Sequence, residues 1–589
     1  MSGKFNIDDL IKLSSFEVSA SEKAGYEKEI DDFLKYAEII NSADCNDLTP
    51  SAHPTESSAK MRMDNQVEWD DLERILINAP VRDKSAYLVP PQKARPGEEK
   101  ESASTAIIAG SHDEYEAVIG LEVHAHLKTK SKLFCSCPTE FGSEPNHNTC
   151  PVCNGHPGVL PVLNHEAVRM AILSGLALNC KINKKSVFAR KNYFYPDLPK
   201  GYQISQFEEP ICSGGFVEID DNGKPLAIKL NRIHMEEDAG KMVHVGAPGI
   251  WGSKASAVDF NRTSVPLIEI VTEPDIKCAK HAKDYVIMLR SVLVQLGICD
   301  GNLEEGSLRC DANISIRKVG ETKLGTKTEV KNMNSFKAIE KAIEFEIERQ
   351  IVLKKTGKAI IQETRLWDEN SQKTFSMRSK EESHDYRYFP DPDLLPIILD
   401  EDYIEELKEF VPEYPLKKKY TYMNIYNLSE EQSLLLINNS AFTAYFDKLV
   451  SIYKDHKNAS NWFFNELISY TNDLKDIHIS PENFVEFLGK IDSDEISGKI
   501  AKEVLKKSFE TKRALVEIIE KDGYKQITDE KELKKMIDDV ISANPAQVAE
   551  YKGGKEKLFS FFVGEMMKKT KGKANPAIVN TLLKNGLTS

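Results

Sequence analysis

Polar residues occupy every second position between residues 120 and 127, where Glu122, His124 and His126 alternate with apolar side chains. A period of two is the period of a β-strand, because successive side chains point to opposite faces of a sheet. One face of this strand therefore carries a carboxylate and two imidazoles, and the other face is apolar. The pattern predicts a sheet with one packed face and one face that is free for chemistry.

Short alternating segments of this kind recur over residues 115–400, which favours an antiparallel sheet. They are Ala117–Lys128, Ala227–Met235, Ser307–Arg317 and Thr326–Lys331. Helices such as His281–Gly297 are expected to interrupt them. After about residue 401 the apolar residues return to helical spacing, as in Glu503–Ile519. The expected fold class is α+β, with an antiparallel-sheet domain followed by all-helical domains.

A small helical segment is expected ahead of the sheet. Apolar residues recur at helical spacing within Glu27–Asn41, and residues 90–113 then mix Pro, Gly, Ser, Glu and Lys without periodicity, as a flexible connector does. The short helix has little to pack on by itself, so it is expected to clasp another domain or another protein of a complex. A chain of 589 residues exceeds what one core normally serves, so several domains are expected.

Composition narrows the functional classes. No apolar run is long enough to cross a bilayer, and the first ten residues lack the pattern of an export signal, so a cytoplasmic protein is expected. Its ten cysteines are then expected to be reduced, metal-bound or buried. The formal net charge of -14 argues against nonspecific coating of nucleic acid and leaves room only for a local basic surface.

Further carboxylates and cations are expected on the polar face of the sheet. Glu236, Glu237 and Asp238 end one predicted strand, and three consecutive acids are costly unless a cation neutralises them. Arg309 and Asp311 share a face of another strand. Oxygen ligands suit Mg²⁺, and interspersed cations suit phosphate, so the mixture favours a nucleotide site. The alternative is a solvated sheet face with cross-strand ion pairs. No P-loop motif is present, which excludes a P-loop kinase.

Four cysteines form two close pairs, Cys135-x-Cys137 and Cys150-x-x-Cys153, separated by twelve residues. This spacing is typical of a zinc knuckle with four thiolate ligands. A shell filled by protein leaves no position for water, so the predicted zinc is structural and not catalytic. The alternative is four reduced thiols. The other six cysteines are scattered and are expected to be buried.

Two further segments are candidate contact surfaces. Residues 190–203 interleave cations with aromatic residues, as a substrate-lining loop does, although a solvated loop fits almost as well. The end of the chain is rich in lysine against the acidic trend of the whole molecule, which indicates a candidate surface for the phosphate backbone of RNA. The alternative is a basic helix that only improves solubility. The predicted tRNA-binding lysines are Lys568, Lys569, Lys571 and Lys573.

Long ordered motifs resemble those of one enzyme family. From Tyr115 to about Leu587 the chain resembles the B subunit of the bacterial aspartyl/glutamyl-tRNA amidotransferase. The matching stretches are GLEVHAHLKTKSKLF, RKNYFYPDLPKGYQISQ, HMEEDAGK, PLIEIVTEPDI, EEGSLRCDANISIR, KNMNSF, DYRYFPDPDL and KGKANPAIVNTLL. Residues 1 to about 92 are similar to the C subunit of the same enzyme, through IDDFLKYAEIINSAD and the later Arg62 and Asp64. The resemblance implies a natural fusion of the C subunit to the B subunit.

This resemblance implies a set of domains. It implies a helical clasp like the C subunit at residues 1–92, a linker at 93–114, a cradle-like sheet domain with the zinc knuckle at 115–400, a helical domain at 401–510 and a tRNA-binding tail domain at 511–589. The extra inserted domain of the archaeal Glu-specific relative is not seen in the sequence, which favours the bacterial B-subunit type.

The resemblance also implies an activity. Such enzymes use ATP and Mg²⁺ to phosphorylate the side-chain carboxylate of Glu on tRNA(Gln) or of Asp on tRNA(Asn), and ammonia then displaces phosphate to form the amide. The expected catalytic residues are Glu122, His124, Glu237, Lys191 and Lys200. The first three are the first-choice Mg²⁺ positions, and the two lysines contact phosphate or guide ammonia. The next candidates for cofactor binding are Glu236, Asp311, Glu305 and Arg309.

An obligatory partner is expected, because this chain has no Gly/Ser-rich amidase signature with which to release ammonia from glutamine. That partner resembles the amidase (glutaminase) of the family, its A subunit, and misacylated tRNA is the other partner. Two rival functions remain. One is a tRNA-binding scaffold without catalysis, and the other is a hydrolytic metal centre that acts on a small substrate. The sequence does not distinguish Asp-tRNA(Asn) from Glu-tRNA(Gln) as substrate.

Overall fold

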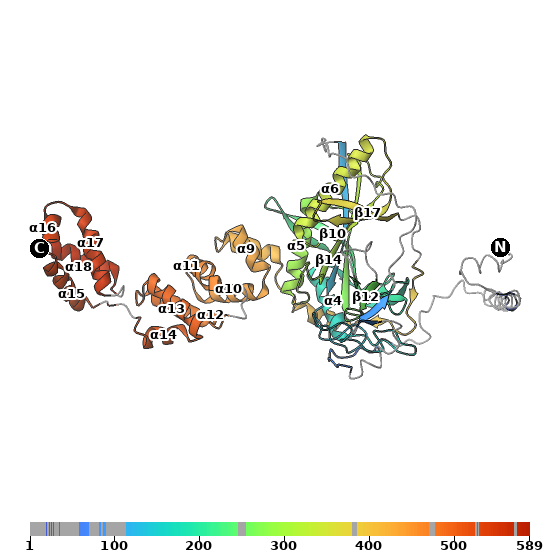
Figure 1. Ribbon diagram of the computed structural model, residues 1–589, viewed down its shortest axis with the longest axis horizontal. Helices are drawn as coiled ribbons and strands as arrows, with labels where there is room; N and C mark the ends of the chain where they lie inside the picture. Colours follow the sequence, from blue (N-terminus) through green and yellow to red (C-terminus); the bar gives the residue numbers. More distant parts are fainter. Residues whose placement is uncertain are drawn as a thin grey trace. The chain divides into compact units, whose positions relative to one another are not determined.

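The structure is a computed structural model, shown in Figure 1. It describes residues 58–69, 82–83, 86–89, 114–245, 255–379, 386–470, 477–524, 527, 529–570 and 574–588, with Ser19, Lys23, Gly25, Lys28 and Lys35. The chain divides into two units, Met1–Ser57 and Ser58–Ser589. The helix expected at Glu27–Asn41 lies outside the described residues apart from Lys28 and Lys35, and the expected connector lies outside them up to residue 113.

A sheet of 13 strands organises the second unit. Its strands are β3 (Tyr115–His126), β4 (Lys181–Ile182), β6 (Phe188–Asn192), β7 (Tyr202–Gln206), β8 (Cys212–Ser213), β9 (Phe216–Asp221), β10 (Lys224–Glu237), β13 (Pro266–Thr272), β14 (Leu308–Lys318), β15 (Thr328–Lys331), β16 (Glu363–Asp368), β17 (Lys373–Ser379) and β18 (Phe389–Pro390). The main order is β17-β16-β15-β14-β3-β13-β10-β7-β6-β18, and β4, β8 and β9 pair off this path.

The predicted strands are confirmed. They correspond to β3, β10, β14 and β15, and each pairing within the sheet is antiparallel except that of β15 with β16. The alternation on β3 works as expected, because Leu121, Val123 and Ala125 are all buried while His124 and His126 are partly exposed.

Three helices cover the apolar face of this sheet: α4 (His165–Ala177), α5 (Ala279–Gln295) and α6 (Phe336–Lys355). The helices α5 and α6 pack together, and both are labelled beside the sheet in Figure 1. The helix α5 packs on β9, and α6 packs on β14. The helix α6 begins after Ser335, whose side chain accepts a hydrogen bond from the amide of Ala338 and so caps the first turn. The opposite face of β3 and its neighbours therefore remains available for polar side chains.

Two smaller sheets contain the other strands of the described residues. One has the order β1-β2-β12-β11 and contains β1 (Arg82–Asp83), β2 (Ala86–Val89), β12 (Ala255–Asp259) and β11 (Lys241–Val245). The other pairs β5 (Lys185–Ser186) with β19 (Ile397–Ile398). The first of them joins β1 and β2, from the N-terminal part of the sequence, to β11 and β12 of the main domain.

The last third of the chain is helical, as predicted. Its elements are α7 (Glu401–Lys408), α8 (Pro415–Asn424), α9 (Glu430–Ile437), α10 (Ser440–Ile452), α11 (His456–Trp462), the π-helix η2 (Phe463–Leu467), the 3₁₀ turn η3 (Ile468–Tyr470), α12 (Pro481–Asp492), α13 (Gly498–Thr511), α14 (Leu515–Lys521), α15 (Glu530–Ala543), α16 (Pro545–Lys552), the 3₁₀ turn η5 (Glu556–Leu558), α17 (Phe559–Lys569) and α18 (Pro576–Thr588). The expected α+β class is confirmed.

These helices contribute to two separate apolar cores. The core of the sheet domain continues through α14 as far as Ile519, and a separate core begins at Leu533 and contains α15, α17 and α18. The helical stretch Glu503–Ile519 is two helices, because Lys512 adopts a left-handed φ of 57° between α13 and α14. None of the helices in the described residues is long and apolar enough to cross a bilayer.

Candidate functional site

Strand register sets a row of polar side chains across four strands. Glu269 of β13 lies opposite His234 of β10 on one side and opposite His124 of β3 on the other. Arg309 of β14 continues the row, because it lies opposite His124. Directly opposite residues of an antiparallel pair have Cβ atoms about 5 Å apart, so the row brings these groups into contact range.

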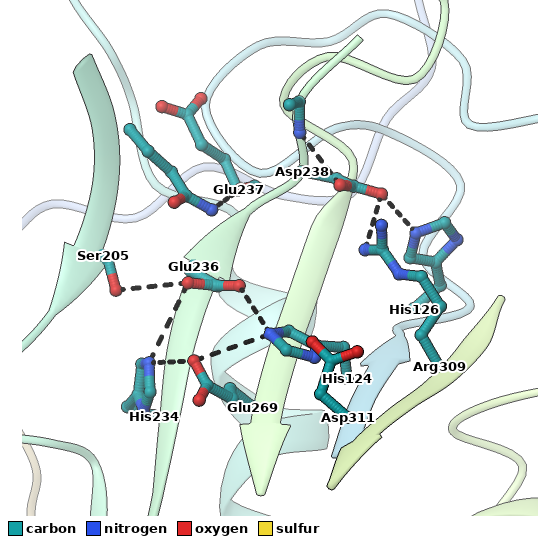
Figure 2. A network of polar contacts seen from close by, with 12 residues as sticks. His124, His126, Ser205, His234, Glu236, Glu237, Asp238, Glu269, Arg309 and Asp311 are labelled. Carbon is teal, nitrogen blue, oxygen red and sulfur yellow. Dashed lines mark hydrogen bonds and ion pairs between the residues drawn. The ribbon is translucent and has the colours of Figure 1, made fainter. Parts of the chain in front are cut away.

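The first group of potential metal ligands is His124, Glu236 and Glu269, whose ligand atoms lie within 4.8 Å of one another. His124 Nε2 lies 3.6 Å from a carboxylate oxygen of each acid. Figure 2 marks both contacts with dashed lines. His234 Nε2 lies 3.0 Å from Glu269. Burial opposes charge on Glu269, but His234, His124 and Lys191 outweigh it and hold the pKa of this carboxyl well below its usual range.

The second group is Glu122, Asp311 and Glu329, on β3, β14 and β15. Asp311 lies opposite Glu122, and the amide of the Asn313 side chain donates to Glu122 Oε1 at 2.9 Å. Burial first, and then the charges of Glu269 and Glu329, raise the pKa of Glu122. Lys331 already pairs with Asp311 and with Glu329, the latter at 3.1 Å, and partly offsets this effect. A metal cation bound here would relieve the remaining repulsion on Glu122.

The three residues that the sequence analysis expects to bind Mg²⁺ do not lie in a single ligand group. Glu122 and His124 fall in two neighbouring groups, and Glu237 belongs to neither group. The reason is the period of the strand, because Glu237 follows Glu236 directly and points to the other side of β10. Figure 2 shows Glu237 directed away from Glu236.

Glu237 is held by other partners. It pairs with Lys200, and its Oε1 accepts a hydrogen bond from the amide of Ile204 at 2.8 Å. The residue is fully buried, and its Oε2 has no hydrogen-bond partner among the described residues. The ammonium group of Lys200 also lies 5.3 Å from the centre of the Tyr202 ring. The buried Oε2 of Glu237 is thus an acceptor without a donor among the described residues.

Asp238 joins the polar face at the end of β10. It accepts from His126 Nε2 at 2.7 Å and lies 3.0 Å from Arg309 and 3.4 Å from Arg262. Burial opposes its charge, but the two arginines and His126 lower the pKa of Asp238 far below its usual range. Arg309 is therefore a fixed cation beside the first ligand group.

Lys191 supplies a second cation to this face. Its Nζ lies 4.8 Å from the centre of the Tyr386 ring. Burial opposes its charge, but Glu236 and Glu269 contribute to raising the pKa of Lys191 above its usual value. The expected substrate-lining segment 190–203 is the end of β6, a turn and the start of β7, so Lys191 comes from a strand.

Glu305 is another expected residue that lies outside both ligand groups. It is exposed in the turn before β14, and its amide donates to Asn302 Oδ1 at 3.2 Å.

Sequence reasoning missed Glu269 and Glu329 as site residues. Glu269 is the acid within the otherwise apolar strand Pro266–Thr272, and its alternation with Ile268 and Ile270 is the signal that would have placed it on the polar face. Glu329 alternates with the buried Thr328 and Val330 on β15, but only the pairing of β14 with β15 brings it to Glu122.

The four predicted zinc ligands converge. Cys135, Cys137, Cys150 and Cys153 place their sulfur atoms within 4.8 Å of one another. Cys153 Sγ lies 4.0 Å from both Cys137 Sγ and Cys150 Sγ. Sulfur atoms around a tetrahedral zinc at about 2.3 Å are about 3.8 Å apart, whereas a disulfide joins them at about 2.05 Å. The spacing fits a metal shared by four thiolates.

A buried lysine provides an independent test of that fit. Lys132 is 0% exposed, and its Nζ lies 3.5 Å from Cys153 Sγ and 3.2 Å from the carbonyl oxygen of Phe260. Within the described part of the chain, no carboxylate forms an ion pair with it. A buried ammonium needs a compensating anion, and a zinc tetrathiolate carries a net charge of -2. Four neutral thiols leave Lys132 uncompensated, so the donor set fits zinc better.

The basic end of the chain is described in part. Lys568 lies 3.9 Å from Glu565, and Lys569 lies 2.9 Å from Asp539. Lys571 and Lys573 lie outside the described residues. The tRNA-binding role of these lysines stays a prediction.

Comparison with known proteins places these sites in a family. The model of the GatB/GatE catalytic domain matches residues 117–405, and the model of the GatB domain matches residues 444–587. The model of the Glu-tRNAGln amidotransferase C subunit matches residues 18–89. The expected likeness of the N-terminal segment to the C subunit is thereby confirmed.

Curated relatives match most of the chain. The aspartyl/glutamyl-tRNA(Asn/Gln) amidotransferase B subunit of Geotalea daltonii is 50% identical over 474 residues, which cover 80% of this chain and 98% of the relative. Those of Persephonella marina and Thermodesulfovibrio yellowstonii are 49% and 51% identical over 80% of this chain. The chain therefore belongs to the B-subunit family of the aspartyl/glutamyl-tRNA(Asn/Gln) amidotransferases, enzymes of the ligase type, and carries a C-subunit domain fused ahead of it.

Proposed function

We propose that this chain uses ATP and Mg²⁺ to convert misacylated Glu-tRNA(Gln), Asp-tRNA(Asn) or both into the amidated forms. A side-chain carboxylate oxygen attacks the γ-phosphorus and ADP leaves; ammonia then attacks the acyl carbon and inorganic phosphate leaves. A free carboxylate is a poor acyl donor, so phosphorylation supplies the leaving group. The observation that carries the proposal is the pair of acidic ligand groups on one sheet face beside Lys191 and Arg309.

The two ligand groups fit Mg²⁺. The first offers Glu236 and Glu269 beside His124, and the second offers Glu122 with its two neighbouring acids. Mg²⁺ takes one or two protein carboxylates together with phosphate oxygens, and when bound it offsets charge on the transferring phosphate. We assign both groups to the metal–nucleotide site, with Arg309 and Lys191 as the cations that bind phosphate oxygen directly.

Lys200 and Glu237 are proposed to guide ammonia to the acyl phosphate. Glu237 Oε2 is buried and has no hydrogen-bond partner among the described residues. This free carboxylate oxygen can accept a hydrogen bond from an N–H group of ammonia. The ion pair with Lys200 holds the carboxylate in place. The pair therefore supports a passage on the side of β10 away from the ligand groups.

The ammonia is proposed to come from an amidase partner, the family's A subunit, because this chain lacks an amidase signature. The relatives are named as B subunits, and the chain carries a fused C-subunit domain, which together support a heteromeric assembly. We expect the purified chain to show negligible glutaminase turnover. Substantial glutamine hydrolysis by the chain alone would contradict this assignment.

The four-cysteine centre is proposed to hold one structural zinc. Its four sulfurs use every tetrahedral position, which leaves none for substrate. Metal analysis of the purified chain should give about one equivalent of zinc. A content below about a tenth of an equivalent would remove the proposal.

The catalytic proposal is tested with ammonium as the nitrogen donor, which makes the amidase unnecessary. The full chain is incubated with ATP, Mg²⁺ and each misacylated tRNA in turn, and amidated tRNA and ADP are measured. The Glu236→Gln variant should lose at least about a hundredfold in rate while tRNA binding remains. The Glu340→Gln variant is the control, because Glu340 pairs with Lys283 on helices that cover the other face of the sheet.

The outcomes separate the rival functions. Binding of tRNA without ATP turnover in the unmodified chain would support the non-catalytic scaffold. Metal-dependent hydrolysis of a small substrate without ATP would support the hydrolytic centre. Formation of amidated tRNA from only one of the two substrates would define the specificity that the sequence leaves open.

A further inference from the structure

The segment 58–69 lies against the loop that carries the first two zinc-site cysteines. The amide of Val67 donates to the carbonyl oxygen of Ser136, between Cys135 and Cys137, at 2.8 Å. The amide of Arg62 donates to Leu163 at 2.9 Å, and the carbonyl oxygen of Arg62 accepts from His165 at 3.0 Å. The segment belongs to the part of the chain that matches the C subunit.

Arg62 reaches the backbone that positions Cys135. Its guanidinium donates to the carbonyl oxygens of Lys132 and Cys135, to that of Val162 at 3.1 Å and to Ser131 Oγ at 2.9 Å. A planar guanidinium offers five N–H groups in a fixed geometry, so it can fix several carbonyl groups at once. Arg62 thereby orients the loop from which Cys135 projects.

Asp64 secures the same loop from its other side. Its carboxylate accepts from the amides of Lys130 at 2.7 Å and Ser131 at 2.8 Å, and from Asn164 Nδ2 at 3.0 Å. Arg62 and Asp64 thus satisfy backbone donors and acceptors on both sides of Lys132, the buried cation next to Cys153. The loop therefore depends for its polar contacts on residues of the part that matches the C subunit.

A second attachment meets the cysteine loop from the opposite end. Strand β2 pairs with β12, with Tyr87 opposite Val258. Asn146, which lies between the two cysteine pairs, donates to the carbonyl oxygen of Val258 at 3.1 Å and accepts from the amide of Phe260 at 2.7 Å. Two segments that match the C subunit are therefore connected with the cysteine loop. The segment 58–69 contacts it directly, and β2 pairs with β12, to which Asn146 of the loop is hydrogen-bonded.

Charge links the docking to the metal. A zinc bound by four thiolates carries a net charge of -2, and two cations, Lys132 and Arg62, lie at its edge. Partners around the ligands of a metal orient them and tune affinity, and their loss typically costs about 10- to 100-fold. Without zinc the thiols can be neutral, and the two cations then lose the negative charge that the zinc centre provides.

We infer that the four-cysteine centre is the docking site of the segment 58–69, and that Arg62 couples zinc binding to this docking. The inference rests on the proposed zinc occupancy. Coupling between two binding events is reciprocal, so docking strengthens zinc binding by the same factor by which zinc strengthens docking. Loss of either event therefore weakens the other. The zinc would then hold the segment 58–69 on the sheet domain.

The test uses the full chain and two readouts. Zinc affinity is measured by competition with a coloured chelator, and amide hydrogen exchange is measured at Arg62 and Val67 with and without zinc. Arg62→Ala should lower zinc affinity at least about tenfold. Arg62→Lys keeps the positive charge but loses the planar guanidinium group with its five N–H donors. The zinc affinity of this variant should therefore lie between those of the unmodified chain and Arg62→Ala. Removal of zinc from the unmodified chain should speed exchange at both amides by a factor of similar size.

Controls separate coupling from general destabilisation. Arg317→Ala also removes a partly buried arginine, one that pairs with Glu116, but Arg317 lies on β14, away from the cysteine loop in the sequence. Its zinc affinity should stay unchanged. Exchange within α5 should not respond to zinc. If Arg62→Ala fails to fold, Asp64→Asn is measured in its place.

Each outcome has one meaning. An unmodified chain without zinc overturns the proposed occupancy. A zinc-loaded chain overturns the coupling alone if Arg62→Ala, or Asp64→Asn in its place, leaves zinc affinity unchanged, or if exchange at residues 62 and 67 is indifferent to zinc.

Discussion

His124 on β3 lies directly opposite Glu269 on β13, and the His124 Nε2 is 3.6 Å from a carboxylate oxygen of Glu269. The same nitrogen is 3.6 Å from Glu236, which comes from the next strand. Three strands thus deliver one imidazole and two carboxylates to one point. A ligand set of this kind depends on the register of the sheet more than on any single segment of sequence.

Glu269 should be as important as the acids that the sequence singled out. Replacement Glu269→Gln keeps the volume and removes the charge, so ammonium-dependent amidation should fall at least about a hundredfold. The rate is measured at saturating tRNA, together with the Mg²⁺ concentration that gives half of the maximal rate. An unchanged rate at every Mg²⁺ concentration would exclude Glu269 from the site.

Mg²⁺ dependence should shift with pH through Glu122. Its pKa is raised by burial and by the charges of Glu269 and Glu329, so it takes up a proton at a higher pH than an ordinary glutamate. Mg²⁺ requires the carboxylate form, and its apparent affinity should therefore decline as pH falls through that raised pKa. Mg²⁺ titrations of amidation between pH 8 and 5 measure this. The Glu122→Gln variant should show weaker binding with less dependence on pH.

Asp238 should stabilise the fold at neutral pH. The two arginines and His126 outweigh burial and depress its folded-state pKa, so its contribution is present above the unfolded value of about 3.9 and is lost as pH falls through the folded value. The Asp238→Asn variant should lose about 2 kcal/mol or more near pH 7. Urea unfolding at several pH values should show the gap between the two proteins narrowing below about pH 4.

Breaking the Lys200–Glu237 pair should be costly. Lys200→Met leaves a fully buried carboxylate without its cation, which typically costs about 3 kcal/mol or more. The urea midpoint of the sheet domain measures this loss. Lys184→Met is the control, because Lys184 and Glu401 form an exposed pair whose removal should leave the midpoint unchanged. Equal midpoints for the two variants would show that the buried pair is unimportant for stability.

Zinc loss should affect stability before chemistry. Cys153→Ser should lower the zinc content and the melting temperature, whereas ammonium-dependent amidation at low temperature should remain close to that of the unmodified chain. Cys180→Ser is the matched control: it removes another buried thiol, whose pKa burial raises to about 12, outside the four-cysteine group. Loss of zinc by Cys180→Ser would contradict the assignment of the ligands.

Sequence alone determined the elements and the chemical types on each. The alternation around Glu122 and His124 fixed which face of β3 would be polar, because a strand has a period of two regardless of its neighbours. The spacing of the four cysteines was likewise sufficient to predict one centre, since two short local pairs need only one loop to meet. The resemblance to the B and C subunits of the amidotransferase rested on motifs that are continuous in the chain.

Tertiary structure decided which groups meet. Glu236 and Glu237 are adjacent in sequence, yet one joins His124 and the other joins Lys200, because strand geometry turns them to opposite sides and the pairing of β10 with its neighbours supplies different partners. Glu269 and Glu329 enter the site through register, and Arg62 reaches Cys135 across 73 positions of sequence. Contacts between distant segments depend on how strands pair, and the pattern within one strand does not say which other segment becomes its neighbour.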